Sequence, residues 1–272
     1  MAQHYATPWN ILKESFIYYG KTFKFNALAV TAMYLPFFLT LSRLMQHMIS
    51  SVEYEYMMDL KFWIWYGASM LYMLPAYIYF GYVMTRKVGL AYRGEEEPLS
   101  ETLRLGLSNF FPLFLLSLLL TLGFLGGYLL LVVPGIILLL AWSLYQPVFV
   151  EEGLRGKAAL KRSRQLTKGF KGEIFGVAFM LVMLLYIVML VLGGIILTLS
   201  WNTLMTHPQP EEIFMTRRFW NGYTLFMGLF TILLIPFYFV IPSIFYFNLK
   251  KEKEPIETGL EPPRPNSPIG LY

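Results

Sequence analysis

Long apolar runs alternate with short polar segments along the whole chain. A helix needs about 20 mostly apolar residues to cross the hydrocarbon core of a bilayer. The runs predict spans at residues 25–44, 62–85, 110–131, 134–150, 173–200 and 221–248. The third and fourth are separated only by Val133-Pro134-Gly135, and a Pro-Gly pair marks a turn, so we predict a tight hairpin there. The pattern therefore predicts an all-α, polytopic membrane protein with six transmembrane helices.

A short amphipathic segment precedes each pair of predicted spans, at residues 9–24, 99–108 and 157–171. Each has an apolar face opposite a polar one, which predicts three interfacial helices lying on the membrane surface. The recurring order suggests three repeats, at 8–89, 98–150 and 156–249, within one membrane domain spanning 1–249. Residues 250–272 hold five prolines and little apolar surface, so we expect a disordered tail.

The third amphipathic segment is strongly basic. Ala159, Ser163, Leu166 and Phe170 fall opposite its cations, and we expect Leu166 and Phe170 to dip into the acyl boundary. The cations would then contact anionic headgroups; they are Lys157, Lys161, Arg162, Arg164, Lys168 and Lys171. The plainer interpretation is a topology anchor whose cations reach the interface without binding a specific ligand.

The distribution of charge indicates how the protein is oriented in the membrane and which kind of partner it binds. The net charge is +5, but the basic residues lie beside apolar segments, which favours anionic lipid over nucleic acid. With six spans, 18 of the 22 Lys and Arg residues fall on one side. The excess of cations on cytoplasmic loops predicts that both termini and the three interfacial helices are cytoplasmic, in the cell (inner) membrane. The chain has no cysteine, which excludes disulfides and thiolate chemistry.

Few residues are candidates for catalysis, metal binding or proton transfer. Glu151, Glu152 and Glu173 form the one candidate polar cluster. Glu151 and Glu152 are better explained by pairing with neighbouring cations, or by a position near the start of the basic helix, where the helix dipole favours negative charge. We predict no metal site and no cofactor, because the histidines are few and scattered and no catalytic motif is present. No ionisable residue falls deep in a predicted span, which counts against a proton-driven transporter.

Three functions follow from these patterns. The first is a non-enzymatic membrane protein that engages anionic lipid, a membrane protein partner or a second copy of itself through the basic segment. The second is a small transporter or channel built from proline-broken helices. The third is a membrane-embedded lipid-modifying enzyme that would use the three glutamates.

The stretch from Val133 to Gly169 resembles a family of prokaryotic membrane proteins. The similarity lies in Val133-Pro134-Gly135, Pro147, Glu152, Ala159-Leu160, Ser163, Leu166-Thr167 and Gly169. The family includes the membrane domain found beside some glycerophosphoryl diester phosphodiesterases and related stand-alone inner-membrane proteins. The resemblance implies a six-helix membrane domain and supplies no catalytic residues. Because no phosphodiesterase barrel follows the last span, glycerophosphodiester hydrolysis is not implied.

Overall fold

The computed structural model describes residues 7–50, 60–130, 132–206 and 217–254, and these residues form helices with short connections and no strand. The predicted all-α class is confirmed. Five segments are long and apolar enough to cross a membrane: 8–40, 110–127, 133–152, 171–195 and 226–253. They indicate a multi-pass membrane protein.

Helices α1 (Pro8–Ser50) and α2 (Leu60–Arg93) form the first hairpin. The predicted interfacial segment 9–24 and the span 25–44 are one continuous helix, because no helix-breaking sequence separates them. Pro8 opens α1, where its missing N–H has no intrahelical partner to lose. The predicted second span lies within α2, which is rich in tyrosine and is not among the five segments named above.

Helix α3 (Leu99–Ser108) has the predicted boundaries. Its small residues, Thr102 and Gly106, are buried, and a side chain at Gly106 would meet Tyr79 and Val83 of α2. Leu107 is 68% exposed on another face of the helix. Leu99 is exposed as well, whereas Leu103 between them is partly buried against the core, so only the two ends of the leucine face point away from the protein.

Helices α4 (Phe110–Leu130), α5 (Val132–Trp142) and α6 (Tyr145–Glu152) form the second hairpin. The glycines of α4 allow close contact with α5, because a Cβ at Gly123 would meet the ring of Trp142. The predicted fourth span is divided, since the chain leaves the α-helix between Trp142 and Tyr145. Pro147 falls in the first turn of α6, where proline is tolerated.

Helices α7 (Gly156–Thr167) and α8 (Lys171–Thr206) follow. The predicted basic helix 157–171 ends at Thr167, because Gly169 takes a positive φ of 91° and turns the chain into α8. Lys168 and Phe170 therefore lie in the turn, and Lys171 begins α8.

The last two helices are α10 (Arg217–Leu234) and α11 (Phe237–Lys253), which divide the predicted sixth span at Pro236. Helix α11 continues past residue 250, where the tail was predicted to begin, and Glu254 follows it in a defined position. The predicted disordered stretch beyond it, 255–272, lies outside the described residues.

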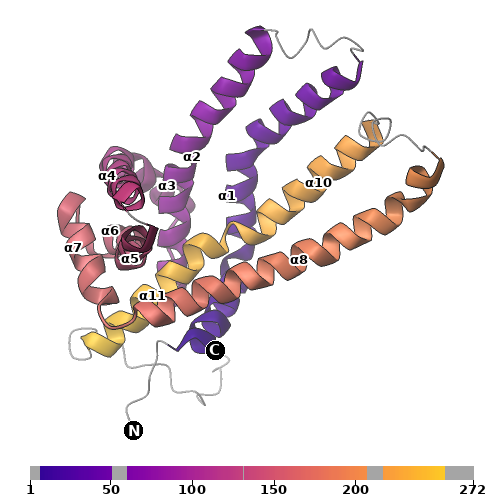
Figure 1. Ribbon diagram of the computed structural model, residues 1–272. Helices are drawn as coiled ribbons and strands as arrows, with labels where there is room; N and C mark the ends of the chain where they lie inside the picture. The colour runs from indigo at the N-terminus through magenta and orange to yellow at the C-terminus, as the bar shows by residue number, and fades with distance from the viewer. Residues whose placement is uncertain (1–6, 51–59, 131, 207–216, 255–272) are drawn as a thin grey trace, which may run out of the picture.

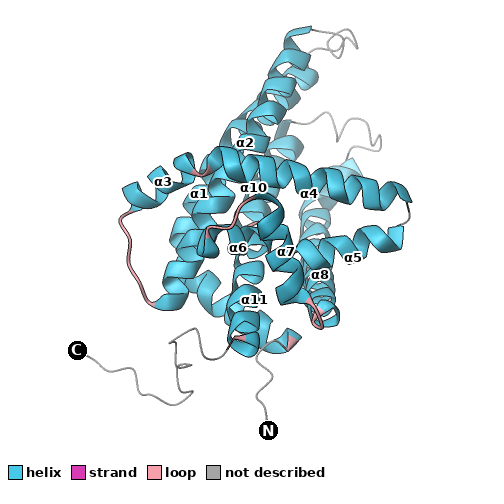
Figure 2. Cartoon of the chain, turned by 90° about the vertical axis from the view of Figure 1, so that its left-hand side faces the viewer, coloured by secondary structure: helices cyan, strands magenta, loops and turns pink. Residues whose placement is uncertain are grey.

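The three hairpins diverge from a common end, which we call the charged end. It is formed by α6, α7, the start of α1 and the ends of α2 and α11. Figure 1 shows α1 with α2, and α8 with α10, extending away from it, while α4 and α5 are seen nearly along their axes. Figure 2 shows α4 and α5 lying across the view, crosswise to α1 and α2.

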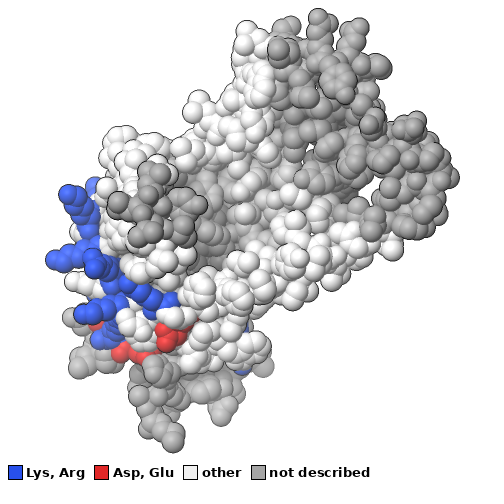
Figure 3. Space-filling view, in the orientation of Figure 1, with Lys and Arg blue, Asp and Glu red and all other residues white. Residues whose placement is uncertain are grey.

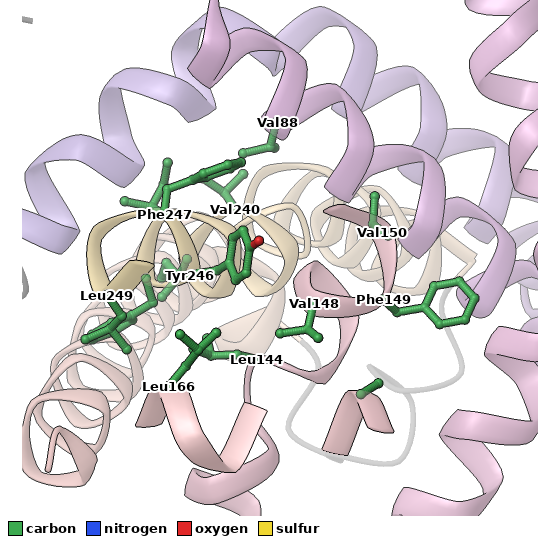
Figure 4. Close-up of a cluster of buried hydrophobic side chains, with 14 of the residues drawn as sticks. Val88, Leu144, Val148, Phe149, Val150, Leu166, Val240, Tyr246, Phe247 and Leu249 are labelled. Atoms are coloured by element: carbon green, nitrogen blue, oxygen red, sulfur yellow. The ribbon is translucent and has the colours of Figure 1, made fainter. Parts of the chain in front are cut away.

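The main apolar core lies at the charged end, where α11 is surrounded by the other helices (Figure 4). Val88 of α2, Val148 of α6, Leu166 of α7 and Tyr246 of α11 all pack into this cluster. Tyr92 stacks on Phe247, with ring centroids 4.3 Å apart. Leu166 is only 1% exposed, so the apolar face of α7 packs on protein and the expectation that Leu166 dips into lipid is wrong.

Two hydroxyl groups of α7 satisfy the backbone at the α5–α6 break. Ser163 Oγ donates to the carbonyl of Ala141 at 3.0 Å and accepts from the N–H of Leu144 at 3.2 Å. Thr167 Oγ1 donates to the same Ala141 carbonyl at 3.1 Å. Buried backbone groups that lack partners are costly, so α7 compensates for the break in the preceding hairpin.

We predict that Ser163→Ala destabilises the protein, because the Leu144 N–H loses its acceptor in a buried site. The expected loss is about 1–3 kcal/mol. Ser108→Ala is the matched control, since among the described residues the exposed Ser108 hydroxyl bonds only Leu105 and Asn109 beside it. Unfolding in detergent measures both variants. Equal stability of the two variants would contradict a structural role for the Ser163 hydroxyl.

Candidate lipid-binding surface and its charged support

The adjacent glutamates of α6 point to different neighbours, because successive helical residues lie about 100° apart. Glu151 pairs with Arg93 of α2, and Glu152 pairs with Arg162 of α7. Gly153 follows them with a φ of 65° and closes α6, donating its N–H to the Phe149 carbonyl. Glycine adopts this left-handed conformation without strain, and it turns the chain so that α7 returns past Glu152.

Arg162 is held by carboxylates on both edges of its guanidinium. Its Nε lies 2.8 Å from Glu152 Oε2, and its Nη1 lies 2.7 Å from Glu254 Oε1. Tyr246 donates its hydroxyl to Glu152 at 3.0 Å, and Lys250 lies 3.7 Å from the same carboxylate. We call these five residues the Arg162 cluster; it joins α6, α7 and the end of α11.

Glu151 occupies a tighter position on the other side of α6. Its side chain is nearly buried and pairs with Arg93, which also bonds Glu95 at 2.8 Å. A side chain at Gly89 would collide with the Glu151 carboxylate, so α2 approaches α6 closely because residue 89 is glycine. The two glutamates thus fasten α6 to α2 on one side and to α7 on the other.

Lys253 caps the far end of α7. Its Nζ donates to the carbonyls of Gln165 and Lys168, at 2.8 Å and 2.7 Å. The last carbonyls of a helix lack intrahelical donors and carry partial negative charge, so an ammonium group there is favourable. Together with the Arg162 cluster, this contact fixes α7 against the end of α11.

The outer face of α7 carries the predicted headgroup-binding cations. Lys157, Lys161 and Arg164 are exposed on it, and Lys168 is exposed just beyond its end. Within the described part of the chain, none of these four forms an ion pair. We call them the basic face. Figure 3 shows Lys and Arg gathered at the charged end with a few Asp and Glu, while the rest of that face carries no charged residue where described.

The remaining predicted site residues lie apart from the basic face. Arg162 is engaged by two carboxylates and is not available to a headgroup in this arrangement. Lys171 and Glu173 lie in the first turn of α8. Glu173 makes no hydrogen bond or ion pair with another described residue, so the structure does not join it to Glu151 and Glu152 in one cluster.

Several of the residues whose contacts hold α6 and α7 in place were not identified from the sequence. Glu254 lies in the stretch predicted to be disordered, and Tyr246 lies inside a predicted span. Arg93 was predicted only to be one of the 18 Lys and Arg residues on the cytoplasmic side. A carboxylate pair followed by glycine could have suggested two opposed partners, but nothing local identifies residues that lie 92 or 94 positions away.

We predict that Arg162→Ala destabilises the protein far more than Arg164→Ala. The first variant leaves Glu152 and Glu254 without their shared cation, whereas Arg164 is exposed and unpaired among the described residues. The expected loss is about 2–4 kcal/mol for Arg162, between the values of exposed and buried ion pairs, and about 0–0.5 kcal/mol for Arg164. Denaturant titration in detergent compares them, and similar losses would contradict the assigned role of Arg162.

Acid should weaken the ion pair of Arg162 with Glu254 and a second ion pair, which joins Arg86 of α2 to Glu97 before α3. Hydrogen bonds from Arg162 lower the pKa of Glu254, and those from Arg86 lower the pKa of Glu97, each from the usual 4.5. A carboxyl whose pKa is lower in the folded state contributes stability above its unfolded pKa and loses it as pH falls through the folded value.

We therefore predict that the stability contributed by Glu97 and Glu254 is fully present at neutral pH and is lost as the pH falls below about 4.5. The double variant Glu97→Gln, Glu254→Gln should be less stable at pH 7 and lose less stability on acidification. Thermal unfolding across this range is the measurement. A variant whose acid loss equals that of the wild type would show that other carboxyls control it.

Comparison of the chain with protein-family models, curated proteins and solved structures finds no match.

Proposed function

We propose that this protein is a non-enzymatic, multi-pass membrane protein that binds anionic lipid headgroups through the basic face of α7. The observation that carries the proposal is the division of α7 into two sides. Ala159, Ser163 and Leu166 are buried against the protein, while Lys157, Lys161 and Arg164 are exposed without an ion-pair partner among the described residues. The cations are thus held on one outward side by the packing of the other.

The surroundings of α7 support a lipid partner over other anions. Helix α7 packs against α5, which continues into the exposed apolar hairpin with α4. Polybasic segments beside apolar surface bind anionic membranes, with each cation contributing on the order of 1 kcal/mol. The nearby Leu107 of α3 is also exposed and would rest at the same interface.

We further propose that the charged end faces the cytoplasm, with both termini on that side. The support is the distribution of cations, because cytoplasmic loops of membrane proteins carry an excess of Lys and Arg, and such residues are gathered at the charged end. Helix α2 fits this orientation, since exposed Trp63 and Trp65 near its start and Arg86 near its end mark opposite interfaces. They are about 21–23 residues apart, or roughly 32–35 Å, close to the thickness of the hydrocarbon core. The resemblance of Val133–Gly169 to a membrane-protein family agrees with this proposal.

Removing three cations from the basic face tests the lipid proposal. We expect the triple variant Lys157→Gln, Lys161→Gln, Lys168→Gln to insert normally and to lose co-purifying anionic lipid, as measured by mass spectrometry of the purified protein. The matched control is Lys13→Gln, Lys21→Gln, Lys24→Gln, which removes the same charge from exposed positions of α1. A further control, replacing the three α7 lysines by arginine, should retain lipid.

Salt provides a second measure. Salt screens electrostatic attraction over a distance of about 8 Å at physiological ionic strength, and over a shorter distance at higher ionic strength. The difference in bound anionic lipid between the two triple variants should therefore shrink in high salt. Wild-type lipid content in the α7 variant would sink the proposal. Equal losses in both variants would assign the attraction to net charge and not to the basic face of α7.

A further inference from the structure

We propose that the α4–α5 hairpin does not cross the bilayer: its tip stays among the lipid acyl chains, and the hairpin enters and leaves at the charged side. The sequence assigned the third and fourth spans to this hairpin, and two independent observations favour a different placement. The inference rests on the membrane location proposed above and not on the lipid preference of α7.

The first observation is orientation. The hairpins α1–α2 and α8–α10 both extend away from the charged end, whereas α4 and α5 are viewed nearly along their axes in Figure 1. Figure 2 shows α4 and α5 running crosswise to α1 and α2. If the long hairpins cross the bilayer, α4 and α5 run mainly along its plane, next to the charged end.

The second observation is the composition of the tip. Residues 122–142, which include the turn between α4 and α5, contain no charged residue and no Ser, Thr, Asn or Gln. The other two hairpin connections are polar, with three acidic residues in 51–59 and two in 207–216. A connection that lies in external water has no reason to be uniformly apolar, whereas one within lipid must be.

The outward surface of the hairpin agrees with a lipid occupant. One complete face of α4 is exposed at spacings of three and four residues, namely Phe111, Leu115, Leu118, Leu122 and Leu125. Val133, directly after the turn, is 66% exposed. An apolar face that runs the full length of a helix is larger than the apolar patches that soluble proteins expose to water.

The backbone of the hairpin also suits this placement. Lipid supplies no hydrogen-bond partners, so an interrupted helix at membrane depth must satisfy its freed groups within the protein. The α5–α6 break meets this condition, since Ser163 and Thr167 bond the Ala141 carbonyl and Ser163 accepts from Leu144. With this placement α3 and α7 still lie on the same side of the membrane, because a hairpin that returns to the side it entered from adds no net crossing.

Single cysteines test the placement, since the chain has no native cysteine to interfere. Val133→Cys and Ile137→Cys report on the hairpin, Gln209→Cys on the expected external side and Glu96→Cys on the charged side. With a membrane-impermeant maleimide, we expect Gln209→Cys to react in intact cells and Glu96→Cys only in opened cells. Both hairpin cysteines should resist in either preparation and react after detergent solubilisation. A nitroxide at residue 133 should be relaxed more by oxygen than by a polar nickel reagent.

Three results would overturn the inference. Reaction of Val133→Cys from outside, as fast as Gln209→Cys, would restore six spans. Reaction only in opened cells would place the hairpin in cytoplasmic water. Continued resistance in detergent would show that protein, and not lipid, covers the tip. Failure of Gln209→Cys to react from outside would instead contradict the proposed topology, while the nitroxide at residue 133 still measures the depth of the hairpin.

Discussion

The ion pairs of Arg162 are the contacts on which the charged end depends. This guanidinium joins Glu152 at the end of α6 to Glu254 beyond the end of α11, two segments about a hundred residues apart. A planar guanidinium can bond a carboxylate along each edge, which a lysine cannot do. The pairs hold α7 in place, and α7 in turn satisfies the broken backbone of the second hairpin. Its outward cations are therefore presented in one orientation by contacts that lipid does not supply.

The sequence predicts those features that depend on local pattern. The boundaries of α3 follow from Pro98 and a short leucine repeat. A hairpin was predicted in the apolar run 110–150 and α4 does pack against α5, but the predicted turn at Val133-Pro134-Gly135 is wrong, because α5 begins at Val132 and the Pro-Gly pair lies in its first turn, where proline is tolerated. The direction of an amphipathic face is harder to predict. Helices α3 and α7 have similar patterns, yet α3 buries Thr102 and Gly106 and exposes Leu99 and Leu107, while α7 buries Leu166. Only the packing partners decide which face is turned to the protein.

The candidate site was predicted in its exposed part and missed in its supporting part. Lys157, Lys161 and Arg164 follow a helical period and need no partner to be recognised. Arg162 belongs to the same run of cations, and nothing local distinguishes it from Arg164. The distinction comes from long-range contacts with α6 and α11. The glutamates show the same limit, because pairing with cations was expected but Arg93 as the partner of Glu151 was not.

The distribution of polar contacts separates a rigid end from less constrained hairpins. At the charged end, ion pairs, stacked rings and hydroxyl contacts to backbone combine with a largely buried α11. Away from it, α8 exposes most of its apolar residues and depends on its surroundings for contact. In a bilayer, exposed apolar side chains carry no penalty, so hairpins can differ in direction without unpaired polar groups. Arg162 and the α7 hydroxyls thus fasten the second hairpin, through α7, to the end of α11.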